Sequence, residues 1–167
     1  MKISGRNIGR RLQLLGNKLS RAKYYHGYGV HSPFVYGLVR KAFMCKRLIE
    51  GTGSALYDAL RANGVAEKRA RQLHNTLHYV EGKSYSINEV GGDMSILLAD
   101  YPTAQLREAY DKAKAAGVTL VVGQPYLNRE RQNEMKMLIA EHRSTTVDNR
   151  AYILFFNNHL PKQHYRL

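Results

Sequence analysis

The chain has 167 residues, with 26 Lys or Arg and 13 Asp or Glu, so its formal net charge at neutral pH is +13. Its single cysteine, Cys45, excludes a disulfide framework or a cysteine-based zinc site within the chain. No apolar run approaches the ~20 residues that span a bilayer. We therefore expect no transmembrane segment and a cytoplasmic location.

The positive charge is concentrated in the first half of the chain. Eleven Lys or Arg precede the first carboxylate, Glu50. Residues 1–80 carry a net charge of +12, whereas residues 81–167 carry +1. Such an uneven distribution indicates an anionic partner, with nucleic acid the first candidate. It does not identify a reaction.

Helices dominate the prediction for residues 1–80. Apolar residues recur at helical spacing in four segments, namely 6–22, 32–49, 54–62 and 66–80. Ser32 and Pro33 suit the N-cap and first position of the second helix, because the cap accepts a backbone hydrogen bond and proline has no N–H to satisfy. We expect a basic helical region that packs on the remainder.

Short β-prone segments alternate with helices after Gly82. Strands are expected at 84–90, 94–99, 118–122, 144–147 and 151–156, with helices at 103–116 and 129–142. Apolar strands separated by helices indicate a parallel sheet with crossover helices. The last two strands are joined by a short turn and should be antiparallel. The chain is thus predicted to be one α/β domain, with a helical region at 1–80 and a half-sheet at 81–167.

Residues 26–36 read HGYGVHSPFVY. This stretch resembles the HG…HSPF signature near the N-terminus of a group of class I S-adenosylmethionine-dependent methyltransferases. Residues 94–100, 118–122 and 145–156 resemble, in order, the fourth strand, the fifth strand and the closing strand pair of that fold, and residues 160–165 resemble its tail. The resemblance implies a reduced Rossmann-like sheet of about four to five strands with crossover helices.

The cofactor-binding half of that fold is missing from the pattern. About a dozen residues separate the helix that ends near Val80 from the strand that begins at Met94, whereas a βαβ unit needs roughly 30. The first three strands and their helices are therefore expected to be absent. We expect no bound cofactor, with S-adenosylmethionine as the alternative.

Four residues near the predicted strands are candidates for an atypical cofactor site. If S-adenosylmethionine binds, the residues to test are Glu89, Gly91, Gly92 and Asp100. A turn between two extended segments is the favoured interpretation of the glycine pair. Asp100 matches one of two acidic positions in metal-dependent relatives, but Gly123 and Gln124 occupy the other. Because a hard cation needs several oxygen ligands, no metal site is predicted.

The basic residues of the first half are the candidate nucleic-acid ligands. We expect phosphate contacts from Arg6, Arg10, Arg11, Lys18, Arg21, Lys23, Arg40, Lys41, Lys46, Arg47, Lys68, Arg69 and Arg71. Tyr25 and Tyr28 lie between two basic helices, and aromatic rings interleaved with cations stack on unpaired bases. The alternative is that these tyrosines pack the two helices together.

Two further features receive structural interpretations. His74 and His78 are spaced i, i+4 on a predicted helix, but a third ligand is not evident, so they are expected to face solvent or phosphate rather than a metal. Cys45, among apolar neighbours, is expected to be a buried thiol.

Three hypotheses follow from these patterns. The first is a non-catalytic, methyltransferase-like protein that binds RNA or a ribonucleoprotein through its basic N-terminal half. The second is an S-adenosylmethionine-dependent methyltransferase with an atypical cofactor site. The third is a peripheral membrane-surface protein that attaches through the helix at 6–22, although its apolar stripe is narrow and lacks Trp or Phe.

Overall fold

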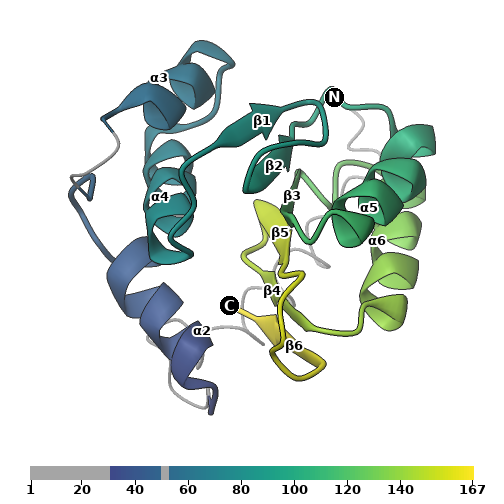
Figure 1. Cartoon of the computed structure of the whole chain (residues 1–167). Helices are drawn as coiled ribbons and strands as arrows, with labels where there is room; N and C mark the ends of the chain where they lie inside the picture. Colours follow the sequence, from purple (N-terminus) through teal and green to yellow (C-terminus); the bar gives the residue numbers. More distant parts are fainter. Residues whose placement is uncertain (1–30, 50–52) are drawn as a thin grey trace, which may run out of the picture.

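The chain folds into three layers, with one sheet between two groups of helices (Figure 1). The computed structural model describes residues 31–49 and 53–167. On one side lie α2 (Pro33–Leu38), a π-helical turn η2 (Val39–Phe43), α3 (Ala55–Ala62) and α4 (Glu67–Tyr79). On the other side lie α5 (Leu106–Ala115), preceded by a 3₁₀ turn η3 (Thr103–Gln105), and α6 (Arg129–Glu141).

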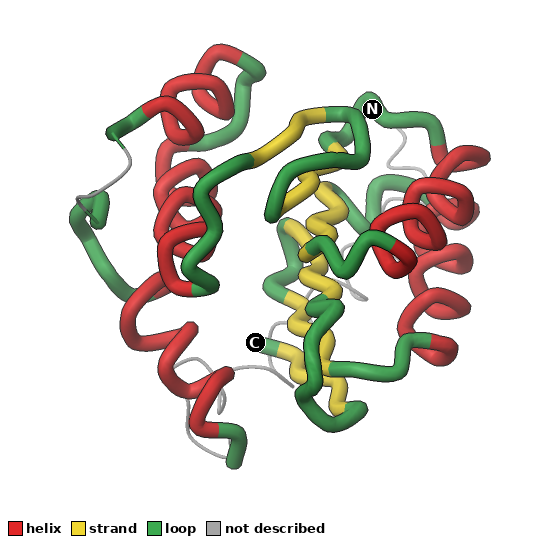
Figure 2. Tube along the Cα trace, viewed as in Figure 1, coloured by secondary structure: helices red, strands yellow, loops and turns green. Residues whose placement is uncertain are grey.

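The sheet has six strands in the order β1-β2-β3-β5-β4-β6. Its strands, drawn in yellow, lie between the two groups of helices (Figure 2). The strands are β1 (Tyr85–Ile87), β2 (Met94–Leu97), β3 (Thr119–Gly123), β4 (Thr145–Asp148), β5 (Tyr152–Phe155) and β6 (Gln163–Arg166). The first three are parallel, and β5 is antiparallel to both β3 and β4. The predicted α/β class, the parallel strands and the antiparallel final pair are confirmed. The prediction of four to five strands is wrong, because the tail adds β6 parallel to β4.

The connection between β1 and β2 is unusually short. It consists of Asn88–Asp93 and contains no helix, whereas parallel strands usually need a dozen or more residues between them. Gly92 makes the turn feasible: its φ is +64°, and a Cβ there would lie 2.9 Å from the carbonyl carbon of Ser84. The carboxylate of Asp93 then accepts hydrogen bonds from the Ser84 hydroxyl (2.7 Å) and from the N–H groups of Lys83 and Ser84 (both 2.8 Å). These bonds lower the pKa of Asp93.

The helix that opens at Ser32 is shorter than expected. Its start is as predicted, since the Ser32 hydroxyl accepts a hydrogen bond from the N–H of Val35 (3.4 Å) and Pro33 occupies the first helical position. The predicted end at residue 49 is wrong. The α-helix changes to a π-helical turn at Val39, and the helix ends after Phe43.

Each face of the sheet has its own hydrophobic core. On one face, α2, η2, α3 and α4 bury Leu38, Leu60 and Leu73 against Ile96 and Phe156. On the other face, α5 and α6 bury Leu106, Tyr110 and Leu138 against Leu120 and Phe155 of the sheet. Strands β2, β3 and β5 contribute residues to both cores, and they are largely apolar for this reason.

Candidate nucleic-acid interface

Helix α4 buries polar side chains as well as its apolar stripe. Gln72, His74 and Asn75 are 4 %, 1 % and 0 % exposed, beside the buried Leu73 and Leu77. The expectation that His74 faces solvent or phosphate is therefore wrong. Buried polar groups need hydrogen-bond partners, and each of these three side chains has a partner more than twenty positions away in the sequence.

The partners of His74 and Asn75 belong to the segment that follows η2, residues 44–49, which we call the basic loop because it contains Lys46 and Arg47. Asn75 makes two bonds: its Nδ2 donates to the Arg47 carbonyl (2.9 Å), and its Oδ1 accepts from the Ile49 N–H (3.0 Å). His74 Nε2 lies 3.2 Å from the Ile49 carbonyl. Gln72 Nε2 donates to the Phe43 carbonyl (3.1 Å) just before the loop.

These bonds explain how the basic loop keeps a defined shape without secondary structure. Backbone N–H and C=O groups that leave a helix need other partners when they are shielded from water, and α4 supplies them. Nε2 of His74 faces a carbonyl oxygen, which only accepts, so this nitrogen carries the proton. The neighbouring His78 ring lies 4.9 Å away, and burial together with His74 lowers the pKa of His78.

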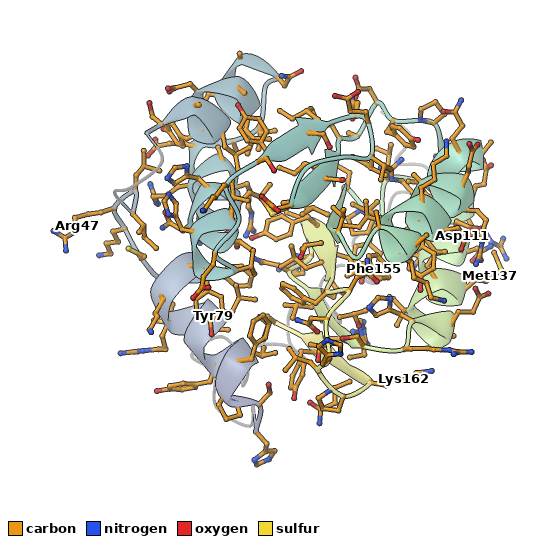
Figure 3. All side chains as sticks on the ribbon, in the orientation of Figure 1. Arg47, Tyr79, Asp111, Met137, Phe155 and Lys162 are labelled. Carbon is orange, nitrogen blue, oxygen red and sulfur yellow. The ribbon has the colours of Figure 1, made fainter. Side chains whose placement is uncertain are left out.

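The backbone of the basic loop is held by α4, but its cations face outward. Lys46 and Arg47 are exposed, as are Arg40 and Lys41 on η2. Arg47 extends away from the body of the protein (Figure 3). Residues 31–49 contain no carboxylate, and none of the four cations forms an ion pair with any described residue. Cys45, expected to be buried, is partly exposed and donates to the Arg47 carbonyl (3.3 Å).

The three predicted cations of α4 have different surroundings. Lys68 is exposed. Arg69 is partly buried, and its Nη1 donates to Gln72 Oε1 (2.8 Å) and to Asn149 Oδ1 in the β4–β5 turn (3.0 Å). Arg71 forms an ion pair with Glu67 one helical turn away (3.0 Å). Arg69 thus ties α4 to the sheet, and the charge of Arg71 is partly neutralised within the helix.

Several predicted ligands lie outside the described residues. They are Arg6, Arg10, Arg11, Lys18, Arg21, Lys23, Tyr25 and Tyr28, together with the helix expected at 6–22 that carries the membrane hypothesis. The candidate interface is therefore built here from Arg40, Lys41, Lys46 and Arg47.

The four residues named for a cofactor site do not come together. Asp100 follows the carboxyl end of β2, where its Oδ1 accepts a hydrogen bond from Asn88 Nδ2 (3.0 Å). Gly92 lies near the amino ends of β1 and β2, against Ser84. The Gly91 N–H donates to the Ser95 hydroxyl oxygen (3.0 Å), and Glu89 is exposed. Gly92 and Asp100 are thus near opposite ends of the same short strand.

A cavity of about 490 Å³ lies at the carboxyl ends of β2 and β3. Its apolar lining includes Leu73, Ile96 and Val121, and its polar lining includes Asp100 and Gln124. The α3–α4 turn forms part of its wall. This cavity was not predicted from the sequence, although the carboxyl ends of strands are where open α/β sheets usually bind ligands. The sequence pattern of parallel strands could have indicated it, because Asp100 and Gln124 follow neighbouring parallel strands and therefore lie at the same edge of the sheet.

Comparison with known proteins identifies no relative of this chain. No family model, curated protein or solved structure matches the chain. Within the described residues, no helix is both long and apolar enough to span a membrane. In the same part of the chain, no three His, Cys, Asp or Glu residues are grouped closely enough to hold a metal ion.

Proposed function

We propose that this chain is a non-catalytic, methyltransferase-like protein that binds RNA or a ribonucleoprotein through its basic N-terminal half. The observation that carries the proposal is the surface formed by η2 and the basic loop. There, Arg40, Lys41, Lys46 and Arg47 are exposed within eight consecutive positions of a carboxylate-free segment. Phosphate contacts of this kind supply most of the affinity of sequence-independent nucleic-acid binding.

The hydrogen bonds from α4 strengthen this proposal. A disordered basic segment loses conformational freedom when it binds, and that loss reduces the affinity. In this protein, Asn75 and His74 already hold the backbone that carries Lys46 and Arg47. Only the long side chains remain to be ordered when a phosphate backbone approaches.

Two features of the sheet support the methyltransferase-like part of the proposal. Strands β2 and β3 are parallel neighbours, and an antiparallel pair, β5 and β4, continues the sheet. This is the order that the resemblance of residues 94–156 implies. The six-residue connection Asn88–Asp93 leaves no room for a βαβ unit before β2, which agrees with a reduced fold.

Salt-dependent binding of the full chain to RNA tests the proposal. We expect fluorescence anisotropy with a labelled RNA duplex to give an affinity that falls steeply as salt increases. If about five phosphates are neutralised, the slope of log affinity against log salt should be about −4 to −5. Affinity that does not depend on salt, or an absence of binding to any nucleic acid at low salt, would contradict the proposal.

The cavity at the carboxyl edge of the sheet favours a second candidate, S-adenosylmethionine-dependent methyl transfer. Asp100 lines this cavity and offers a carboxylate to a hydroxyl or amino group of a ligand. Isothermal titration of the full chain with S-adenosylmethionine tests it. Binding at micromolar concentration that weakens in Asp100→Asn would support this function. No heat and no thermal shift would exclude it and leave the first proposal intact.

A further inference from the structure

One aromatic side chain on the basic surface is displayed to solvent. Tyr36 in α2 is 48 % exposed, and it is the only exposed Phe or Tyr among residues 31–49 and 53–167. Its neighbours in the same helix point inward: Val35 and Leu38 are fully buried. Phe34 packs against the rings of Tyr79 and Phe156, with centroids 5.3 and 5.0 Å away.

The exposed position of Tyr36 follows from the way α2 packs. Tyr79 approaches α2 at Gly37, where an added Cβ would overlap the Tyr79 hydroxyl. The Tyr79 hydroxyl donates to the Phe34 carbonyl (2.8 Å). The side of α2 that faces α4 is therefore fully occupied, and Tyr36 lies on the other side. The backbone of Tyr36 is bonded within the helix, but its side chain forms no hydrogen bond or ring contact with the described residues.

Cations accompany the Tyr36 ring. Arg40 lies four residues further along, so it shares a helical face with Tyr36. Lys41 follows it, and both cations are exposed and form no ion pair within the described residues. A single exposed aromatic ring normally has little effect on the stability of a soluble protein. An exposed ring beside unpaired cations is the combination that binds an unpaired base and its phosphate together.

We propose that Tyr36 is a stacking platform, and that Tyr36, Arg40 and Lys41 make the basic surface prefer single-stranded nucleic acid to duplex. This inference rests on the proposed function and specifies its partner. Bases in a duplex are stacked on each other and do not offer a face to the ring, whereas unpaired bases do. The cations contact phosphates in either case, so only the preference for single strands depends on the ring.

The experiment compares two full-chain variants with a matched control. Tyr36→Ala removes the ring, and Tyr36→Phe retains it without the hydroxyl. Met137→Ala serves as the control, because Met137 is also 48 % exposed and lies on α6, on the other side of the sheet (Figure 3). Anisotropy is measured for each protein with an unpaired oligouridylate and with a hairpin duplex of equal phosphate number. Thermal melts check that each variant is folded.

Stacking predicts a specific pattern. Tyr36→Ala should weaken binding of the single strand about tenfold and leave the duplex affinity unchanged. Tyr36→Phe and Met137→Ala should bind both RNAs as the parent chain does. Equal losses for the two RNAs, a loss in Tyr36→Phe as large as in Tyr36→Ala, or no loss in Tyr36→Ala would overturn the inference. Failure of the parent chain to bind either RNA would instead contradict the proposed function.

Discussion

The two helical sides of the sheet have similar apolar cores but different surface charge. The described residues up to Val80, which include α2, α3 and α4, contain eight Lys or Arg and two acids. The helices α5 and α6 have nearly balanced charge, and several of their charged side chains form ion pairs. Arg107 bridges Glu134 (3.1 Å) and Glu141, while Lys112 lies 2.7 Å from Glu108.

This difference separates what folds the protein from what it offers to a partner. Both helical layers bury leucines and aromatic rings against the same strands, so packing does not require the excess charge of the α2–α4 side. Exposed cations without acidic neighbours repel each other and reduce stability slightly. Their concentration on one side is therefore best explained by a ligand. Predictions that affect one side and spare the other test this view.

The largest effect is expected from Arg131, a fully buried residue of α6. Its guanidinium donates to the carbonyls of Tyr101 (2.8 Å), Leu98 (2.9 Å) and Gly123 (3.0 Å), which joins α6 to the carboxyl ends of β2 and β3. Arg131→Met should lower the free energy of unfolding by about 3 kcal/mol, because three partly or fully buried carbonyls lose a charged donor. Urea unfolding measures this.

RNA affinity of the folded Arg131→Met protein should be unchanged, since α6 and the helices α2 and α4 lie on opposite sides of the sheet (Figure 1). Arg131→Lys retains a charged donor and should lower the free energy of unfolding by less than Arg131→Met does. A variant Arg131→Met as stable as the parent chain would show that the three carbonyl bonds contribute nothing.

Asn75 should give the next largest effect, on the other side of the sheet. Asn75→Ala removes both bonds to the basic loop, and we expect the free energy of unfolding to fall by about 2 kcal/mol. Unlike Arg131→Met, it should also accelerate hydrogen exchange of the Ile49 amide and weaken RNA binding, because the loop would no longer be held. Unchanged exchange at Ile49 would contradict the role assigned to Asn75.

A smaller, pH-dependent effect is expected at His142, which follows α6. Its Nε2 donates to the Phe156 carbonyl (3.1 Å), and its Nδ1 accepts from the Tyr110 hydroxyl (3.0 Å), so the buried ring is neutral. Burial lowers the pKa of His142, with a further contribution from Lys114 and Lys162. The unfolded state, with a pKa near 6.5, therefore takes up more protons than the folded state as the pH falls through that value.

Stability should accordingly decrease on acidification from about pH 7.5 to about pH 5.5. Urea midpoints at the two pH values measure the loss. His142→Gln, which does not titrate in this range, should show a smaller pH dependence than the parent chain. An equal pH dependence in the two proteins would mean that other groups dominate.

The smallest effect is expected from the surface ion pairs of α5 and α6. Arg107→Ala removes both bridges, to Glu134 and Glu141, yet such exposed pairs contribute only about 0.5 kcal/mol each. A small shift of the thermal midpoint should be accompanied by unchanged RNA affinity. A large loss of RNA affinity in Arg107→Ala would show that the α5–α6 side also takes part in binding.

The sequence predicted the elements whose signals are local. Ser32 and Pro33 marked a helix start, and alternating helices and apolar strands marked the parallel sheet. The end of η2 was missed because residues 44–49 contain no helix breaker. Their conformation depends on hydrogen bonds with Asn75 and His74, more than twenty positions away. Strand β6 was missed because its mostly exposed residues, Gln163–Arg166, have little of the apolar pattern of a strand.

The candidate interface was predictable in charge but not in geometry. The acid-free sequence identified Arg40, Lys41, Lys46 and Arg47 as candidates. It did not show that Arg69 donates a hydrogen bond to Asn149 in the β4–β5 turn, or that Tyr36 is the only exposed Phe or Tyr among the described residues. Spacing along a helix shows which residues share a face, but only the packing of α2 against α4 determines which face is covered.

The central claim is that binding depends on where the cations lie and not on net charge alone. Two double variants of the full chain test it, and each removes two exposed cations. One is Lys46→Ala with Arg47→Ala in the basic loop, and the other is Lys112→Ala with Lys136→Ala on α5 and α6. The loop variant should lose about tenfold in RNA affinity at low salt, and its salt slope should decrease in magnitude by about 2. The α5–α6 variant should bind almost as the parent chain does. Equal losses in the two variants would contradict the claim.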